Sequence, residues 1–303
     1  MTDDPSICVL LPTLNEEATV GVVVEDFRDE GFENILVIDG GSSDNTQELA
    51  EAAGARVVTQ SGSGKGQAIA EAVSEYIEAE IILMADADAT YRASDAHAML
   101  EPLQKGADHV IGNRFAKMHP DAMSRLNKFG NSVINSTFSY IHGQQLLDIL
   151  SGYRAFTRSS FLAINPNRSG FGIETELAVE CIRHGQRVEV VPIHYDPRPS
   201  GSATNLRPFR DGSVIFLTLY RLTRTNNPLF FFGSLGFLST IVGTLVATFV
   251  GYRWFWEGVS HEVLAVVGGF GIIFGVQLLM FGLLSDLIVK LHREQMRRLD
   301  ERD

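Results

Sequence analysis

Ile81-Ile82-Leu83-Met84-Ala85-Asp86-Ala87-Asp88 is the stretch that decides the fold of this 303-residue chain, because an apolar run ends in two carboxylates one residue apart. Such a run is typical of a buried strand. Side chains alternate between the faces of a strand, so Asp86 and Asp88 can point the same way at a sheet's carboxyl edge. Carboxylate and substrate phosphate oxygens together commonly hold Mg²⁺ or Mn²⁺. The stretch therefore predicts a divalent-metal site. The alternative is a turn whose aspartates cap a helix beginning near Ser94.

Predicted strands and helices alternate around this stretch. We expect strands over Ile7–Leu11, Ile35–Ile38, Arg56–Thr59 and Glu80–Met84, with helices over Glu16–Glu30, from about Asp44, and over Gln67–Ile77. This order indicates an α/β domain with a mostly parallel sheet and helices on both faces. Ligands of such sheets bind beyond the carboxyl ends of the strands.

Polar segments follow three of these strands and should converge on one crevice. They are Pro12-Thr13-Leu14-Asn15-Glu16, Asp39-Gly40-Gly41-Ser42-Ser43-Asp44 and Asp86-Ala87-Asp88. The G-x-G-x-x-G of a dinucleotide fold is missing after the first strand. A Walker phosphate loop also fails, since Thr59 and Gly66 stand where Gly and Ser or Thr are required. We expect a flexible loop over residues 61–66, with Lys65 near phosphate.

Two long uncharged runs, Leu229–Tyr252 and Val263–Ser285, predict two transmembrane helices, since each can cross about 30 Å of hydrocarbon. A buried hairpin of a soluble protein is the alternative. We expect an α/β domain over residues 1–205, a juxtamembrane amphipathic helix over 206–227 and the two spans with a short basic tail over 228–303. Within 206–227, the apolar run Val214–Tyr220 suits a helix on the membrane surface, or an ordinary packing helix.

Flanking charges predict the orientation of the two spans. Basic residues concentrate before the first span and after the second, so both ends and the first domain should be cytoplasmic. These residues are Arg207, Arg210, Arg221, Arg224, Lys290, Arg293, Arg297 and Arg298. The connector carries Arg253 against Glu257 and Glu262, and its aromatic residues (Tyr252, Trp254, Phe255, Trp256) suit the opposite interface. The first residues do not show the basic, apolar and small-residue pattern of a signal sequence, so we expect the first two hundred residues to stay in the cytosol.

Charge is distributed unevenly along the chain. The first 205 residues carry 15 Lys and Arg against 29 Asp and Glu, and only 5 of the chain's 25 cationic residues are lysine. This acidity makes nucleic acid an improbable partner and is consistent with a high-salt cytoplasm. Cys8 lies in a predicted strand and Cys181 in a predicted helix, so we expect two buried small hydrophobes rather than a disulfide or metal site.

Six motifs occur in order and together resemble one family. They are Pro12-Thr13-Leu14-Asn15-Glu16-Glu17, Asp39-Gly40-Gly41-Ser42-Ser43-Asp44, Gly64-Lys65-Gly66, Asp86-Ala87-Asp88, Gly112-Asn113-Arg114-Phe115 and Ser151-Gly152-Tyr153-Arg154-Ala155-Phe156. The set resembles family 2 glycosyltransferases of GT-A fold, specifically the polyprenyl-phosphate sugar synthases, and looks like archaeal dolichyl-phosphate hexosyltransferases. The resemblance covers nearly all of the first domain.

The resemblance implies a nucleotide-sugar site and a metal site. Pro12, Glu16 and Asp39 would hold the base and ribose, with Thr13, Lys65, Asp86 and Ala87 completing the nucleotide-sugar site. Asp88 would ligate Mg²⁺ or Mn²⁺ directly, with Asp86 nearby on ribose or through water. Relatives often have Gln two residues beyond the second aspartate. This chain has Thr90 at that position, and a threonine is a poorer metal ligand.

The resemblance also implies an acceptor site. Arg114, Lys128, Ser132 and Arg198 would contact the acceptor phosphate, and Lys128 and Ser132 share one helix face within a predicted helix over Asp121–His142. Where the family has a Gly-x-Ser-Lys loop, this chain has Gly201-Ser202-Ala203-Thr204, which lacks the Lys. Asp148 would act as a base, touch the sugar, or orient Arg154.

The most consistent function is inverting transfer of a hexose from a nucleotide diphosphate sugar, UDP-glucose being favoured, to dolichyl phosphate in the bilayer for protein N-glycosylation. GDP-mannose is an alternative donor. A polysaccharide or lipid hydroxyl is an alternative acceptor, although the Gln-x-x-Arg-Trp of processive relatives is missing. A third alternative is a non-catalytic, membrane-tethered nucleotide-sugar sensor.

Overall fold

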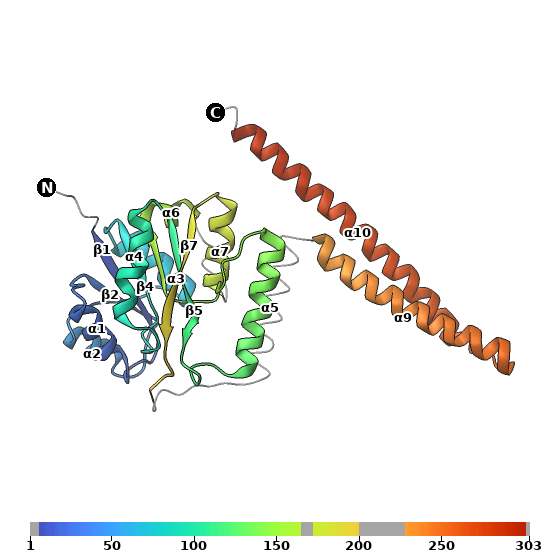
Figure 1. The fold of residues 1–303 in the computed structure, drawn as a ribbon, viewed down its shortest axis with the longest axis horizontal. Helices are drawn as coiled ribbons and strands as arrows, with labels where there is room; N and C mark the ends of the chain where they lie inside the picture. Colours follow the sequence, from blue (N-terminus) through green and yellow to red (C-terminus); the bar gives the residue numbers. More distant parts are fainter. Residues whose placement is uncertain (1–5, 165–171, 200–227, 301–303) are drawn as a thin grey trace. The chain divides into compact units, whose positions relative to one another are not determined.

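The computed structural model describes residues 6–164, 172–199 and 228–300, and it divides the chain into two compact units, Met1–Gly212 and Ser213–Asp303. The first unit is an α/β fold on a seven-stranded sheet of order β3-β2-β1-β4-β6-β5-β7 (Figure 1). Its strands are β1 (Ile7–Thr13), β2 (Ile35–Asp39), β3 (Arg56–Thr59), β4 (Ile81–Met84), β5 (His109–Met118), β6 (Arg154–Thr157) and β7 (Val188–Tyr195). The predicted juxtamembrane helix lies outside the described residues.

The sheet is mostly parallel, as the alternation of elements predicts. β1 pairs in parallel with β2 and β4, β2 pairs in parallel with β3, and β5 pairs in parallel with β7. The exception is β6, which runs antiparallel to both β4 and β5. Thr13 is in register with Asp39, and Leu10 with Met84, so the ends of three strands meet at one edge.

Helices cover both faces of the sheet. α1 (Val20–Asp29), α2 (Thr46–Ala52) and α4 (Ala96–Gln104) share one apolar core with alternate residues of β1 such as Val9 and Leu11. The other face packs on α3 (Lys65–Glu71), α6 (Arg158–Ile164) and α7 (Ile173–Arg183). Burying each Leu, Ile or Val contributes about 1.5–3 kcal/mol. Cys8 and Cys181 belong to this second core as buried free thiols, which confirms the prediction made for them.

Two helices begin later than their apolar periodicity predicts. α1 begins at Val20 rather than Glu16, because Asn15 adopts a φ of 58° and residues 16–19 form a turn in which Thr19 N–H donates to the Glu16 carbonyl. α5 (Arg125–His142) begins after Ser124, whose hydroxyl accepts a hydrogen bond from Asn127 N–H. Because the Ser124 hydroxyl caps the first turn, the helix begins at Arg125, and the predicted start at Asp121 is too early.

The second unit contains two long helices, α9 (Pro228–Glu257) and α10 (Glu262–Asp300), which include both predicted spans. Both are long and apolar enough to cross a membrane, and only 11% of each apolar window is buried within the described chain, unlike a soluble core helix. Glycines let their backbones approach closely: a Cβ on Gly243 would lie 2.7 Å from the Gly268 carbonyl oxygen. Ser239 Oγ also donates to the Gly271 carbonyl across the pair (2.8 Å).

Candidate active site at the carboxyl edge of the sheet

The three polar strand ends lie together at this edge. Thr19 Oγ1 donates to the Ala87 carbonyl (2.7 Å), which ties the turn after β1 to the segment after β4. Asn15 N–H donates to Ser42 Oγ (2.9 Å), which ties the same turn to the loop after β2. The site therefore forms where β1, β2 and β4 end.

Asp39, the last residue of β2, shapes the loop that follows it. Its buried carboxylate accepts hydrogen bonds from Gly41 N–H (2.9 Å), Ser42 N–H (2.8 Å), Ser42 Oγ (2.5 Å), Gln47 Nε2 (2.7 Å) and Thr13 Oγ1 (3.3 Å). Burial alone would raise the pKa of Asp39, but these hydrogen bonds outweigh it and lower the pKa. A nucleotide base would have to share these oxygens with the loop's own donors.

Asp88 lies in the crevice with only 4% of its surface exposed. Thr90 donates to Oδ1 through its N–H (3.1 Å) and its hydroxyl (2.5 Å), and Arg198 Nη2 lies 2.6 Å from Oδ2. Thr90 therefore orients Asp88. Burial raises the pKa of the nearby Glu16; Arg198 opposes that rise, while the charges of Asp88 and Asp86 add to it.

The alternative of a turn with helix-capping aspartates is wrong in its helix cap but not in its turn, because Thr90 N–H donates to Asp88 two residues earlier, as in an Asx-turn. Neither carboxylate caps the helix near Ser94: Asp88 bonds to Thr90, and Asp86 accepts from Lys65 Nζ (2.5 Å). The N-cap residue of α4 is Asp95.

The segment before α3 is anchored in the structure rather than free. Gly64 turns the chain at a φ of 94°, and Lys65 is the first residue of α3. The buried Glu71 carboxylate accepts from Ser61 N–H (2.9 Å) and Ser61 Oγ (2.7 Å). Lys65 bridges Asp86 and Glu174, and Glu174 is a site residue that the sequence patterns did not reveal.

Arg114 on β5 forms a two-pronged ion pair with Asp148. Arg114 Nε and Nη2 each lie 2.8 Å from one Asp148 oxygen, and the Arg114 N–H also donates to Asp148 (3.1 Å). Arg114 also lies over the Tyr195 ring, 5.3 Å from its centroid. The alternative in which Asp148 orients Arg154 is wrong, since Arg154 instead donates to backbone carbonyls, including that of Ile149 (2.8 Å).

A groove of about 600 Å³ runs along α5 and includes two of the predicted acceptor residues. Lys128 and Ser132 lie one helical turn apart in it, and Lys128 Nζ donates to the Pro120 carbonyl (3.2 Å). The rest of the lining is Asn113, Phe115, Asn135, Ser136, Ser139, Gln145 and Leu147. Most of the lining residues are polar, but apolar atoms, including those of Phe115 and Leu147, make up most of the exposed surface of the groove.

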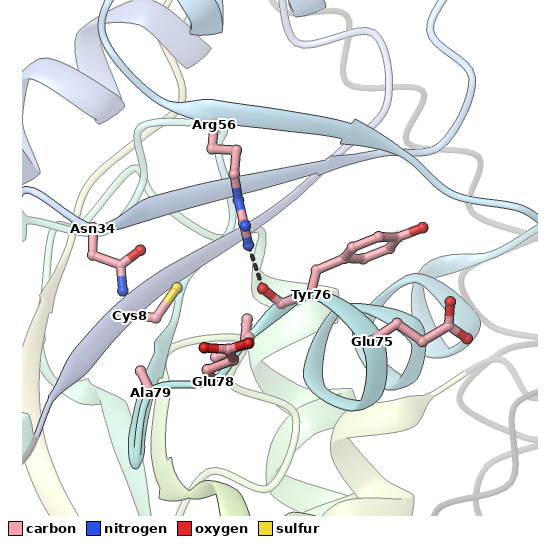
Figure 2. A pocket seen from close by; sticks show the side chains of 8 residues that line it. Cys8, Asn34, Arg56, Glu75, Tyr76, Glu78 and Ala79 are labelled. Atoms are coloured by element: carbon pink, nitrogen blue, oxygen red, sulfur yellow. Dashed lines mark hydrogen bonds between the residues drawn. The ribbon is translucent and has the colours of Figure 1, made fainter.

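A second pocket, of about 360 Å³, lies at the opposite, amino ends of the strands (Figure 2). Figure 2 shows Arg56 donating to the Tyr76 carbonyl across this pocket, beside Cys8 and Asn34. None of the predicted site residues lines it.

The donor set at the crevice fits a divalent cation shared with a substrate. Among the described residues there is no group of three or more His, Cys, Asp or Glu that could hold a metal alone. Mg²⁺ at phosphate sites, however, usually takes one or two carboxylates and completes its shell with phosphate and water. Asp88 can take this role because Thr90 orients one of its oxygens, and a cation would take the place of the Arg198 guanidinium at the other.

Comparisons with known proteins agree with this fold and identify the family. The family described as "Glycosyl transferase family 2" matches residues 8–164. The chain is 61% identical over 301 residues to "Glycosyltransferase AglJ" of Haloferax volcanii, covering 99% of each. It is 31% identical over 211 residues to "Dolichyl-phosphate hexose transferase" of the same organism, covering 69% of this chain and 90% of the relative.

A solved structure extends the comparison to the fold. The glucosyl-3-phosphoglycerate synthase of Mycobacterium tuberculosis, in complex with Mn²⁺, uridine diphosphate and glucosyl-3-phosphoglycerate, aligns with a TM-score of 0.58 at 22% identity, covering 72% of this chain and 80% of that one. At this identity the likeness supports a GT-A-like fold. The chain therefore belongs to glycosyl transferase family 2 and is a nucleotide-sugar glycosyltransferase.

Proposed function

We propose that this glycosyltransferase moves a hexose, with inversion, from UDP-glucose to dolichyl phosphate and so supplies dolichyl-phosphate hexose for protein N-glycosylation. The observation that carries the proposal is the buried Asp88, oriented by Thr90 and paired with Arg198, at the edge where three strands end. The dolichyl-phosphate hexose transferase among the relatives supports the acceptor class. The uridine diphosphate complex of the M. tuberculosis synthase supports the donor class.

On the donor side, the strand ends bind the nucleotide. Pro12, Thr13, Glu16, Asp39 and Ala87 surround the base and ribose, while Lys65 and Asp86 lie toward the diphosphate. Asp86 and Asp88 would hold Mg²⁺ or Mn²⁺, which would neutralise the charge of the diphosphate leaving group. Arg198 adds a second positive charge near the leaving diphosphate, because its guanidinium lies 2.6 Å from the Asp88 carboxylate.

On the acceptor side, the phosphate brings its own nucleophile. Its second pKa is about 6, so a dianionic oxygen is available at neutral pH without a strong general base. Asp148 is therefore assigned to holding Arg114, which engages both of its oxygens. Arg114, Lys128, Ser132 and Arg198 position the phosphate, and Lys128 and Ser132 line the groove along α5.

The hairpin of α9 and α10 holds the enzyme where its lipid substrate resides. Both helices are long and apolar enough to span a bilayer. Basic residues outside both spans support a cytoplasmic catalytic unit with both termini on the same side. The enzyme then takes its soluble donor from the cytosol and its acceptor from the same leaflet.

Membranes containing the protein test this function directly. They are incubated with dolichyl phosphate, Mg²⁺ or Mn²⁺ and a panel of labelled UDP- and GDP-sugars, and organic extracts are scored for an anionic glycolipid. We expect product from UDP-glucose, lost on chelation and lost in Asp88→Ala membranes. Product only from GDP-mannose would overturn the donor, product only on a hydroxyl acceptor would overturn the acceptor, and no product from any donor would overturn the proposal.

A further inference from the structure

Lys65 lies between two carboxylates that come from distant segments. Its Nζ is 2.5 Å from Asp86 Oδ1 and 2.6 Å from Glu174 Oε1. Lys65 opens α3, Asp86 follows β4, and Glu174 is in the first turn of α7. The Glu174 side chain is only 14% exposed, against 35% for Lys65. One ammonium group therefore joins three segments at the rim of the crevice.

Both carboxylates have rigid supports. The Glu174 carbonyl accepts a hydrogen bond from the fully buried Arg154 (Nη2, 2.8 Å), which holds the first turn of α7. Asp86 fits closely against Gly152, where an added Cβ would lie 2.4 Å from Asp86 Oδ2. Lys65, on a long and flexible side chain, is the member of this triad that can move.

The carboxylates of Asp86 and Glu174 have different roles in the proposed reaction. Asp86 has to face the donor, and the Lys65 ammonium competes with a cation or a ribose hydroxyl for the oxygen that it pairs with. Glu174 is not part of the proposed donor site. It is a second anionic partner that can keep Lys65 beside the crevice after Asp86 has released it.

We propose that Glu174 is a positioning residue for the donor: it retains the Lys65 ammonium at the crevice when Asp86 exchanges that ammonium for the bound nucleotide and its metal. The inference rests on the proposed function, because it assigns a duty to Asp86 within it. Without the Glu174 carboxylate, Lys65 has Asp86 as its sole partner in the triad. Donor and metal must then compete with the ammonium for that oxygen, and Lys65 is no longer held near the diphosphate.

Glu174→Gln tests the proposal in the full-length protein, with UDP-glucose as the varied substrate. We expect the KM for UDP-glucose to rise about tenfold, the loss typical of one charge-assisted hydrogen bond, while kcat stays within about threefold. Glu174→Asp, which keeps the charge, should recover part of that loss. Glu180→Gln is the matched control, because it removes a carboxylate from the same helix that, within the described part of the chain, forms ion pairs with Arg183 and His184 and not with Lys65. The KM of this variant should be unchanged.

A double-mutant cycle shows whether Glu174 acts through Lys65. In a Lys65→Met background, Glu174→Gln should add no further rise in KM. If Glu174→Gln does not fold, Glu174→Asp carries the same test, with KM raised in the native background and unchanged beside Lys65→Met. An unchanged KM in the single variant, a fall in kcat alone, or full additivity in the cycle would each overturn the proposal.

Binding of Mn²⁺ with UDP, followed by the EPR signal of free Mn²⁺, separates this inference from the proposed function. The assay needs neither acceptor nor turnover. We expect wild type to bind and Glu174→Gln to bind about tenfold more weakly. Equal affinities would overturn the role of Glu174 and leave the enzyme assignment standing, whereas wild type that fails to bind Mn²⁺ with UDP would overturn the donor site itself.

Discussion

Asp88 combines burial with a fixed orientation, which is what a charge-bearing catalytic residue needs. Thr90 contacts one oxygen of Asp88 and Arg198 the other. Asp88 would hold the divalent cation, so removing its carboxylate should remove the cation that neutralises the leaving diphosphate. We expect Asp88→Ala to lower kcat by about 10³-fold, at the upper end for loss of one electrostatic group. Glycolipid formation from labelled UDP-glucose measures this. Asp121→Ala, an exposed aspartate with a side chain 85% accessible, is the control. Normal transfer by Asp88→Ala would contradict the metal assignment.

Asp148 acts on stability through Arg114. The pair is buried, with side chains 9% and 0% exposed, so Asp148→Asn would leave a guanidinium without its counter-ion in a low-dielectric interior. Breaking such a pair from one side costs about 3–5 kcal/mol. For a unit of this size, that lowers the unfolding midpoint by roughly 6–20 °C. Thermal unfolding of the detergent-solubilised protein measures it.

Glu189→Gln is the control for Asp148→Asn, because Glu189 pairs with Arg187 at the surface, where both side chains are about half exposed. An exposed pair contributes only about 0–1 kcal/mol. Equal shifts for the two variants would show that Arg114 does not depend on Asp148.

Residues next to each other in the sequence were predicted better than residues brought together by folding. The aspartates after β4 and the polar segments after β1 and β2 were predicted, because each directly follows an apolar run. Glu174 was missed because its partner Lys65 lies 109 positions away. The sequence also did not reveal that Asp148 pairs with Arg114 and not with Arg154. The reason is the same, since 34 residues separate Arg114 from Asp148.

At the scale of elements, the close contact of α9 and α10 depends on glycines. The nearest atoms to a Cβ on Gly243 would be backbone atoms of α10, which cannot rotate away as a side chain can. Gly243→Val should therefore separate the helices and destabilise the hairpin by about 1–3 kcal/mol. The resistance of the detergent-solubilised protein to thermal unfolding or proteolysis within residues 228–300 measures this.

Gly269→Val provides the matched control for that helix pair. Gly269 lies on α10 beside the facing glycines, but nothing lies within 4 Å of a Cβ added there. The same change in side-chain volume should leave the hairpin's resistance unchanged. If both variants behave alike, helix propensity rather than backbone contact decides the stability of the pair.

Periodicity predicts that an element exists better than it predicts where the element begins. α1 and α5 each begin about four residues later than expected, because a turn and a capping serine decide the start. β6 is the larger surprise. Its four residues insert between β4 and β5 and run antiparallel to both, and nothing in so short a stretch specifies its partners before the sheet assembles.

At the scale of the whole molecule, the α/β fold and the apolar hairpin were both predictable, because each follows from patterns repeated over many residues. The α/β fold follows from alternating strands and helices, and the hairpin from two long uncharged runs. The convergence of distant site residues was predictable only in outline. Parallel strands bring their carboxyl ends to one edge, but the side-chain partners at that edge depend on the finished packing.

The acidity of the chain leads to a prediction about salt. The first 205 residues carry 29 acidic against 15 basic residues, so like charges repel across the folded surface at low ionic strength. The screening length falls from about 30 Å at 0.01 M salt to about 3 Å at 1 M, which removes most of this repulsion. We expect the unfolding midpoint to rise by about 5–15 °C between low and molar KCl, equivalent to about 2–5 kcal/mol, with turnover rising in parallel.

Sucrose of equal osmolality separates screening from solute exclusion, because it is excluded from protein surfaces but carries no charge. If repulsion between carboxylates is the cause, KCl should stabilise the protein far more than sucrose does. The effect should also saturate once the screening length falls below the spacing of surface charges. Equal unfolding midpoints and equal turnover at low and molar salt would contradict this account, and the acidic, lysine-poor surface would then have no bearing on the conditions in which the enzyme works.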